Sequence, residues 1–205
     1  MKISKICNFF FVLCILSLFL IIFASGCISP DSSKSDDDDI LKAMKNAENR
    51  LFSINWNTDN PGNIRAKLLA SESEFKTIFD ALSAAKPSSN EEAEKIYALR
   101  TLSCSYIDMI AAMMDLANVI EHYNKAESYA GLYEKYNWEM EILTADSALA
   151  SARNNLYSAE YRISGLNVNM VPITLQGDVT EMKVRIEEMK TLMNNLADEF
   201  STALN

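Results

Sequence analysis

Acidic side chains and the single histidine recur at seven-residue spacing in two stretches of the chain. The first row is Asp108, Asp115 and His122, and the second is Asp146, Arg153 and Glu160. Carboxylates seven residues apart on a helix lie about 10 Å apart, which is wide for two carboxylates that share one acid–base reaction. The rows therefore predict solvated helix faces rather than a catalytic pair.

Other residue types that could carry chemistry are few and isolated. His122 is the single histidine, so no pattern supports a Ser–His–Asp triad, and the spacings CxxC, HExxH and ExxH are absent. Four cysteines occur in the chain, and Cys104 lies in an apolar stretch, where a lone cysteine is usually a small buried hydrophobe. We therefore expect no enzyme activity, no metal site and no cofactor.

The N-terminal segment contains a cysteine with a different chemical context. Lys2 and Lys5 precede an unbroken apolar run, and the small residues 24–26 (Ala-Ser-Gly) lead directly into Cys27. Basic, apolar and small-residue regions in this order predict a secretory signal peptide. Because a cysteine follows the small residues, residues 24–27 resemble the lipobox of prokaryotic lipoproteins, bacterial and archaeal, although Ala24 stands where that family prefers Leu.

The lipobox resemblance implies that Cys27 receives a diacylglyceryl group and becomes the first residue after residues 1–26 are removed. Two acyl chains give stable membrane anchoring, which one chain does not. The alternative is an uncleaved anchor helix over residues 8–24, a length at the short limit for crossing a bilayer. A soluble product is the least favoured reading. We expect a protein that is lipid-anchored at the cell membrane and faces outside the cytoplasm.

Composition separates a tether from a folded domain. Residues 27–39 are polar, contain Pro30 and end in four Asp, a composition that forms no core and predicts an acidic flexible tether. Residues 40–205 form the expected domain. Removing residues 1–26 takes away two Lys and no acid, so the net charge falls from −9 to −11. Such a surface argues against nucleic acid as a partner.

Residues 40–205 predict an all-α fold, because the chain has five Gly, four Pro and almost no strand-like alternation. Expected helices span residues 38–54, 61–85, 89–123 and 132–164, and a last helix runs from Asp178 onwards. Ser89 with Glu92, and Asp178 with Glu181, have the capping-box spacing. A turn is placed between Asn124 and Gly131, and a continuous helix through these residues is the alternative.

Apolar seams predict how these helices pack. Residues 132–164 carry a seam of Ile142, Ala145, Leu149, Ala152, Leu156, Ala159 and Ile163, and the last helix carries a coiled-coil-like heptad seam. Short turns favour antiparallel neighbours. The pattern predicts an up-and-down antiparallel bundle of four to five helices with long central helices, as a monomer or a homodimer.

Aromatic residues concentrate around the third turn of this bundle. Tyr129, Tyr133 and Trp138 lie in a stretch of 17 residues that holds four of the eight Tyr. Amphipathic aromatic side chains are favoured at interfaces, and in an up-and-down bundle this turn lies at the end away from the anchor. We expect these three residues to form a partner-binding patch. A plug for the end of the core is the alternative.

Together these features favour a lipid-anchored, non-catalytic module that binds or scaffolds an unidentified protein. The alternative is a small-ligand sensor or carrier with a pocket between helices lined by Tyr and Met. A buried polar cluster would favour the sensor, and an exposed aromatic patch would favour the protein-binding module.

Overall fold

Five α-helices and one short 3-10 helix make up the part of the chain described by the computed structural model, residues 36–56 and 59–204. The helices are α2 (Asp36–Phe52), α3 (Pro61–Ala84), α4 (Asn90–Gly131), α5 (Lys135–Ser164) and α6 (Ile173–Leu204), with η2 (Val168–Met170) between the last two. No strand occurs among these residues. The expected all-α fold is confirmed. Cys27 and the signal peptide lie outside the described residues.

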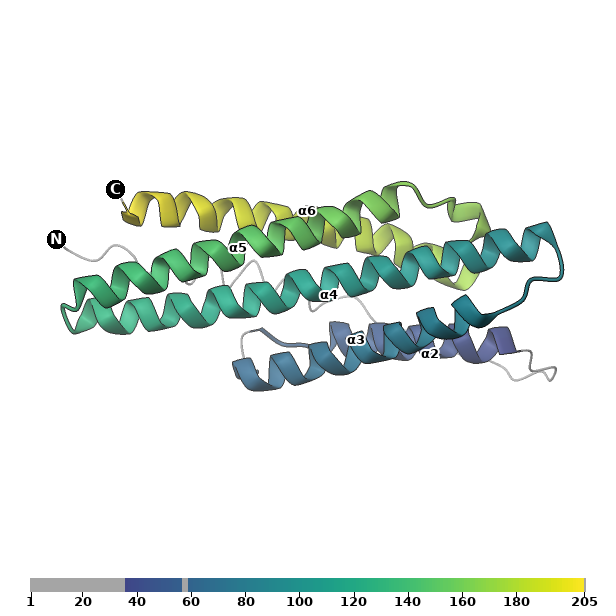
Figure 1. Ribbon diagram of the computed structural model, residues 1–205, viewed down its shortest axis with the longest axis horizontal. Coiled ribbons are helices and arrows are strands. Elements are labelled where there is room, and N and C mark those ends of the chain that lie inside the picture. The colour runs from purple at the N-terminus through teal and green to yellow at the C-terminus, as the bar shows by residue number, and fades with distance from the viewer. Residues whose placement is uncertain (1–35, 57–58, 205) are drawn as a thin grey trace.

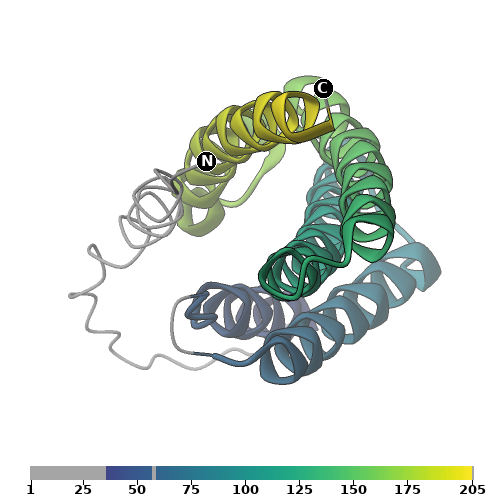
Figure 2. The same cartoon turned by 90° about the vertical axis from the view of Figure 1, so that its left-hand side faces the viewer.

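The helices alternate in direction and pack as an up-and-down bundle. The antiparallel pair of α4 and α5 lies in the middle, with α2 and α3 on one side and α6 on the other (Figures 1 and 2). At 42 residues α4 is about 60 Å long, and the α4–α5 turn projects beyond α2 and α3 (Figure 1). This turn lies at the end of the bundle opposite the start of α2 (Figure 1).

Local sequence signals explain where several helices begin. The side chain of Asn60 accepts a hydrogen bond from the backbone of Asn63 at 2.9 Å, and Pro61 opens α3. Ser89 caps α4 by accepting from the backbone of Glu92 at 3.2 Å. The Glu92 carboxylate reaches back to the backbone of Ser88 at 2.6 Å, one residue before the position that a standard capping box uses.

One continuous core joins all five helices. All seven seam residues predicted on α5 are buried, because Ala alternates with larger side chains and lets α4 and α6 approach closely. Phe75 of α3 stacks on Tyr106 of α4 with ring centroids 4.4 Å apart. Phe200 of α6 lies 5.9 Å from Tyr123 of α4. Aromatic pairs therefore tie the outer helices to the central pair.

Among the described helices, α4 is long and apolar enough to cross a membrane by length and composition alone. Half of that apolar stretch is buried inside the bundle, where α4 packs against both α3 and α5. Its apolar character is accounted for by its central position.

Three helix ends differ from the sequence-based expectation. The expected turn between two helices exists, but its position between Asn124 and Gly131 is wrong: it lies at residues 132–134, because α4 continues to Gly131 through residues such as Lys and Ala that favour a helix. The capping box at Asp178 is also wrong: α6 begins at Ile173, because Leu175 is buried in the core and extends the helix backwards. At the other end, α2 begins at Asp36, so the four Asp lie in its first turn.

Candidate functional site

The α4–α5 turn has the hydrogen-bond pattern of a Schellman motif. The backbone N–H of Glu134 donates to the carbonyl of Tyr129 at 3.1 Å, and that of Tyr133 donates to the carbonyl of Ala130 at 3.3 Å. In this motif the left-handed residue directly precedes the one whose N–H makes the longer of the two hydrogen-bonded turns, and it is usually Gly. Here it is Tyr133, with φ 60°, the one non-glycine residue in the described ranges with positive φ. Gly131 stands two positions too early to take that role.

Exposed apolar side chains surround this turn. Tyr133 is 95 % exposed and Tyr136 is 73 % exposed, with Leu132 exposed between α4 and α5. Met140 and Leu143 continue the exposed apolar surface along α5. We call residues 129–143 the hairpin tip. Most of its side chains are exposed, whereas Trp138 and Ile142 pack in or against the core.

The three aromatic residues expected to form a patch occupy different environments. Tyr133 is exposed, whereas Tyr129 is half-buried. Trp138 is also half-buried and packs against the core. Tyr123, nearly two turns before the tip, stacks near Phe200. Trp138 and Tyr123 therefore form a plug at this end of the core, beside an exposed surface centred on Tyr133.

A hollow of about 290 Å³ lies beside the tip, between α4, α5 and α6. Tyr123 and Trp138 supply aromatic walls, and Ile142 supplies an apolar one. Its polar lining consists of Glu127, Asp198, Glu199 and Thr202. We call it the tip pocket. The pKa of Tyr123 is raised to about 12, first by burial and then by the nearby charges of Glu127 and Glu199.

A second group of exposed aromatic residues lies at the opposite end of the α4–α5 pair. Tyr97, Tyr157 and Tyr161 border a shallow hollow with Arg162 and Gly165. No local sequence pattern marks this group, because its members are up to 64 positions apart in the chain. Each of the three lies within a regular helix, so their backbone carries no strain comparable to that at Tyr133.

The seven-residue row on α4 links that helix to α5 instead of facing solvent only, whereas Asp146 of the second row is exposed. Asp108 accepts from Arg162 at 2.7 Å, and Asp115 accepts from Ser151 at 2.7 Å. His122 Nδ1 lies 2.6 Å from a Glu141 oxygen. Residues seven apart share one helix face, and on α4 that face borders α5. Among the described residues, no group of three or more His, Cys, Asp or Glu is arranged to hold a metal ion.

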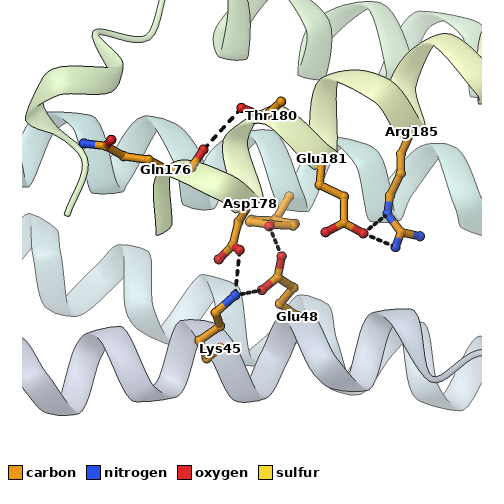
Figure 3. Close-up of polar contacts among 8 residues, drawn as sticks. Lys45, Glu48, Gln176, Asp178, Thr180, Glu181 and Arg185 are labelled. Carbon is orange, nitrogen blue, oxygen red and sulfur yellow. Dashed lines mark hydrogen bonds and ion pairs between the residues drawn. The ribbon is translucent and has the colours of Figure 1, made fainter. Parts of the chain in front are cut away.

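A buried polar cluster lies where α2 meets α4 and α6 (Figure 3). Lys45 of α2 donates to Glu48 at 3.0 Å and to Asp178 of α6 at 2.6 Å. The hydroxyl of Tyr106, on α4, donates to the other oxygen of Glu48 at 2.8 Å. Glu48 and Asp178 are both buried, and Asp178 Oδ2 is buried without a hydrogen-bond partner in the described part of the chain.

Burial shapes the protonation of this cluster. Burial raises the pKa of the Glu48 carboxyl, and the charge of Asp178 raises it further, against the opposing hydrogen bonds from Tyr106 and Lys45. Burial alone would lower the pKa of Lys45, but the hydrogen bonds to Asp178 and Glu48 outweigh it and raise that pKa. The Tyr106 pKa is well above its ordinary value, mainly through burial. Tyr106 therefore stays a neutral hydrogen-bond donor.

The cluster satisfies most of its own polar atoms and so acts as a connection between helices. Beside it, Arg185 of α6 pairs with Glu181 (Figure 3). The Arg185 guanidinium also lies 3.7 Å from the centre of the Phe52 ring. The sequence analysis missed Lys45 and Glu48. The available signal was Glu48, a charged residue four positions after Met44 and beside Ala47 on the apolar face of its helix.

Comparison with models of protein families, with curated proteins and with solved structures gives no match to this chain. The fold and the site geometry are therefore the basis for any statement about function.

Proposed function

We propose that this protein is a lipid-anchored, non-catalytic binding or scaffold module outside the cytoplasm, and that the hairpin tip contacts its protein partner. Tyr133 is the observation that carries the proposal. A tyrosine at a left-handed position costs about 1–2 kcal/mol relative to a right-handed one, and glycine is free of that cost. Because the Tyr133 side chain is 95 % exposed, packing returns little of that energy.

Strained backbone that the surrounding structure holds in place is over-represented at functional positions. Large exposed apolar patches are likewise typical of interaction surfaces. At the hairpin tip the two features coincide: the strained Tyr133 is flanked by exposed Leu132 and Tyr136. Tyrosine suits such a surface because it buries a large area and keeps a polar hydroxyl.

The direction of the helices supports the same assignment. The tether would join the bundle at the start of α2, and the hairpin tip lies at the opposite end (Figure 1). A chain anchored through Cys27 would then present the tip to a partner at a distance set by α4, about 60 Å long.

Cross-linking of the native anchored protein tests the proposal. Full-length protein, Tyr133→Ser and Tyr161→Ser are cross-linked in their own membranes, and the captured proteins are compared. Tyr161 is a matched control because it is also exposed and lies at the other end of α5. The proposal expects capture to fall with Tyr133→Ser and to persist with Tyr161→Ser. Equal capture by both variants would contradict it.

The anchor is tested separately. Cys27→Ser is expected to lose the mass of the acyl groups and to leave the detergent phase, because the thiol is the expected site of attachment. Unchanged mass and unchanged membrane retention would favour the uncleaved anchor helix over residues 8–24.

The small-ligand sensor or carrier is the second candidate function, and the tip pocket is the observation that favours it. The pocket lies between helices and is lined by Tyr123 and Trp138. At about 290 Å³ it is near the lower end of the range of small-molecule sites. The buried cluster at Lys45 gives this candidate little support, because its cation and carboxylates already pair with one another.

A further inference from the structure

The tip pocket combines aromatic walls with a concentration of negative charge. Its lining includes Tyr123 and Trp138 together with the carboxylates of Glu127, Asp198 and Glu199, and it includes no Lys or Arg. Aromatic faces attract cations through their quadrupole, with Trp the strongest of the side chains. Carboxylates add an attraction of the same sign. The two kinds of lining therefore favour the same class of ligand.

The shape and chemistry of the lining exclude other ligand classes. An anion would meet three carboxylates and no basic side chain. An uncharged apolar ligand would gain nothing from the negative charge of those carboxylates. A bare metal ion prefers a shell of oxygen ligands, whereas much of this wall is aromatic or aliphatic.

We propose that the tip pocket binds an organic ammonium group. The group could be carried by a lysine side chain of the protein partner or by a free small molecule, since both present the same cation. The lysine source rests on the proposed function, because Trp138 belongs to both the pocket and the hairpin tip. Binding of a free ammonium compound in the pocket does not depend on it.

Titration of the full-length chain in detergent tests the proposal directly. The chain has two Trp, Trp56 and Trp138, so tryptophan labelled with nitrogen-15 gives two indole signals. Choline is the cationic probe, and 3,3-dimethyl-1-butanol is its uncharged counterpart of the same shape. We expect choline to shift the Trp138 signal saturably while Trp56 stays unchanged, and we expect the neutral probe to bind about tenfold more weakly. Equal binding of the two probes, or no saturable shift, would overturn the proposal.

Charge-neutralising variants locate the cation. The variant E127Q/D198N/E199Q removes the three carboxylates of the lining. The control E94Q/D146N/E188Q removes three exposed carboxylates outside it and changes the net charge equally. We expect choline affinity to fall about tenfold in the first variant and to change less than twofold in the control. Equal losses would show an effect of overall charge and would overturn the site.

Two further measurements check that the variant folds and identify the source of the cation. Circular dichroism checks that the triple variant keeps its helices; if it does not, Glu127→Gln alone replaces it, with the same direction of effect expected. N-acetyl-lysine amide is titrated beside choline: tighter binding of the lysine probe assigns the pocket to a protein partner, and tighter binding of choline assigns it to a small molecule. A Trp138 shift with calcium but with neither organic cation would refute the proposal.

Choline binding and the capture experiment with Tyr133→Ser together distinguish this inference from the proposed function. If choline binds but Tyr133→Ser leaves capture of the partner unchanged, the pocket stands and the tip surface fails. If choline does not bind but Tyr133→Ser abolishes capture, the tip surface stands and the pocket inference fails.

Discussion

The buried cluster around Lys45 and the hairpin tip around Tyr133 use similar residue types in opposite ways. In the cluster, Tyr106 is buried and its hydroxyl has a partner 2.8 Å away. At the tip, Tyr133 is exposed and holds a left-handed backbone. The cluster's polar atoms pair with one another inside the fold, whereas the left-handed position of Tyr133 has a steric cost that its exposed side chain does not offset by packing. We therefore propose that the cluster serves the structure and that the tip serves a contact outside it.

Removing the shared cation should give the largest loss of stability. Lys45→Met leaves Glu48 and Asp178 buried without the charge that both contact. Breaking a buried pair costs about 3–5 kcal/mol. Because Lys45 is half-exposed, the expected loss lies below that range, at about 2–3 kcal/mol. Urea unfolding measures the change. The control Lys76→Met breaks the exposed pair with Glu72 and should cost about 0.5 kcal/mol or less. Equal losses would contradict a structural role for the cluster.

Truncating the aromatic residues at the tip should cost different amounts of unfolding free energy, because their side chains differ in burial. Trp138→Ser is expected to cost about 2 kcal/mol, because the indole is half-buried against the core. Tyr133→Ser is expected to change the unfolding free energy by about 0.5 kcal/mol or less. Thermal melting followed by circular dichroism ranks the two. A larger loss for Tyr133 than for Trp138 would show that Tyr133 is part of the core plug.

The stability contributed by Glu48 should fall as the pH rises above 4.5, its ordinary pKa. Burial raises the Glu48 pKa in the folded state, so between 4.5 and that raised pKa the folded chain binds more protons than the unfolded chain. Folding is then favoured by lower pH across that window. The window is absent in Glu48→Gln.

Urea unfolding of the natural protein and of Glu48→Gln, between pH 4.5 and 7, measures the pH-dependent stability that Glu48 contributes. The unfolding free energy of the natural protein, minus that of Glu48→Gln, is expected to decrease with rising pH. An increase would mean that Lys45 holds the Glu48 carboxylate ionised and that burial is the weaker influence.

The regular parts of the fold could be predicted from sequence because their signals are local. The α5 seam is an unbroken alternation of Ala with larger residues, and all of it is buried. Asn60 and Ser89 cap the helices that follow them, as their spacing indicates. Local patterns also misled: Asp178 and Glu181 have the spacing of a helix start but lie inside α6.

The remaining features depend on contacts that no local pattern reveals. Lys45 and Asp178 are 133 positions apart, and their pairing follows from how α2 and α6 pack. The left-handed backbone at Tyr133 follows from where α4 ends, and the residue type argues against it. The concentration of aromatic residues did point to this turn, but burial separates Tyr133 from Trp138 only once the helices are placed.

Tyr133→Gly gives the one expected gain in stability and the most direct test of the comparison. Glycine relieves the left-handed strain but gains freedom in the unfolded chain, so the unfolding free energy should rise by about 0.5–1 kcal/mol. Urea unfolding of Tyr133→Gly against the natural protein is the decisive measurement. A rise would show that Tyr133 is kept at the expense of the fold. A fall of similar size would show that its side chain stabilises the bundle and would contradict a role in binding.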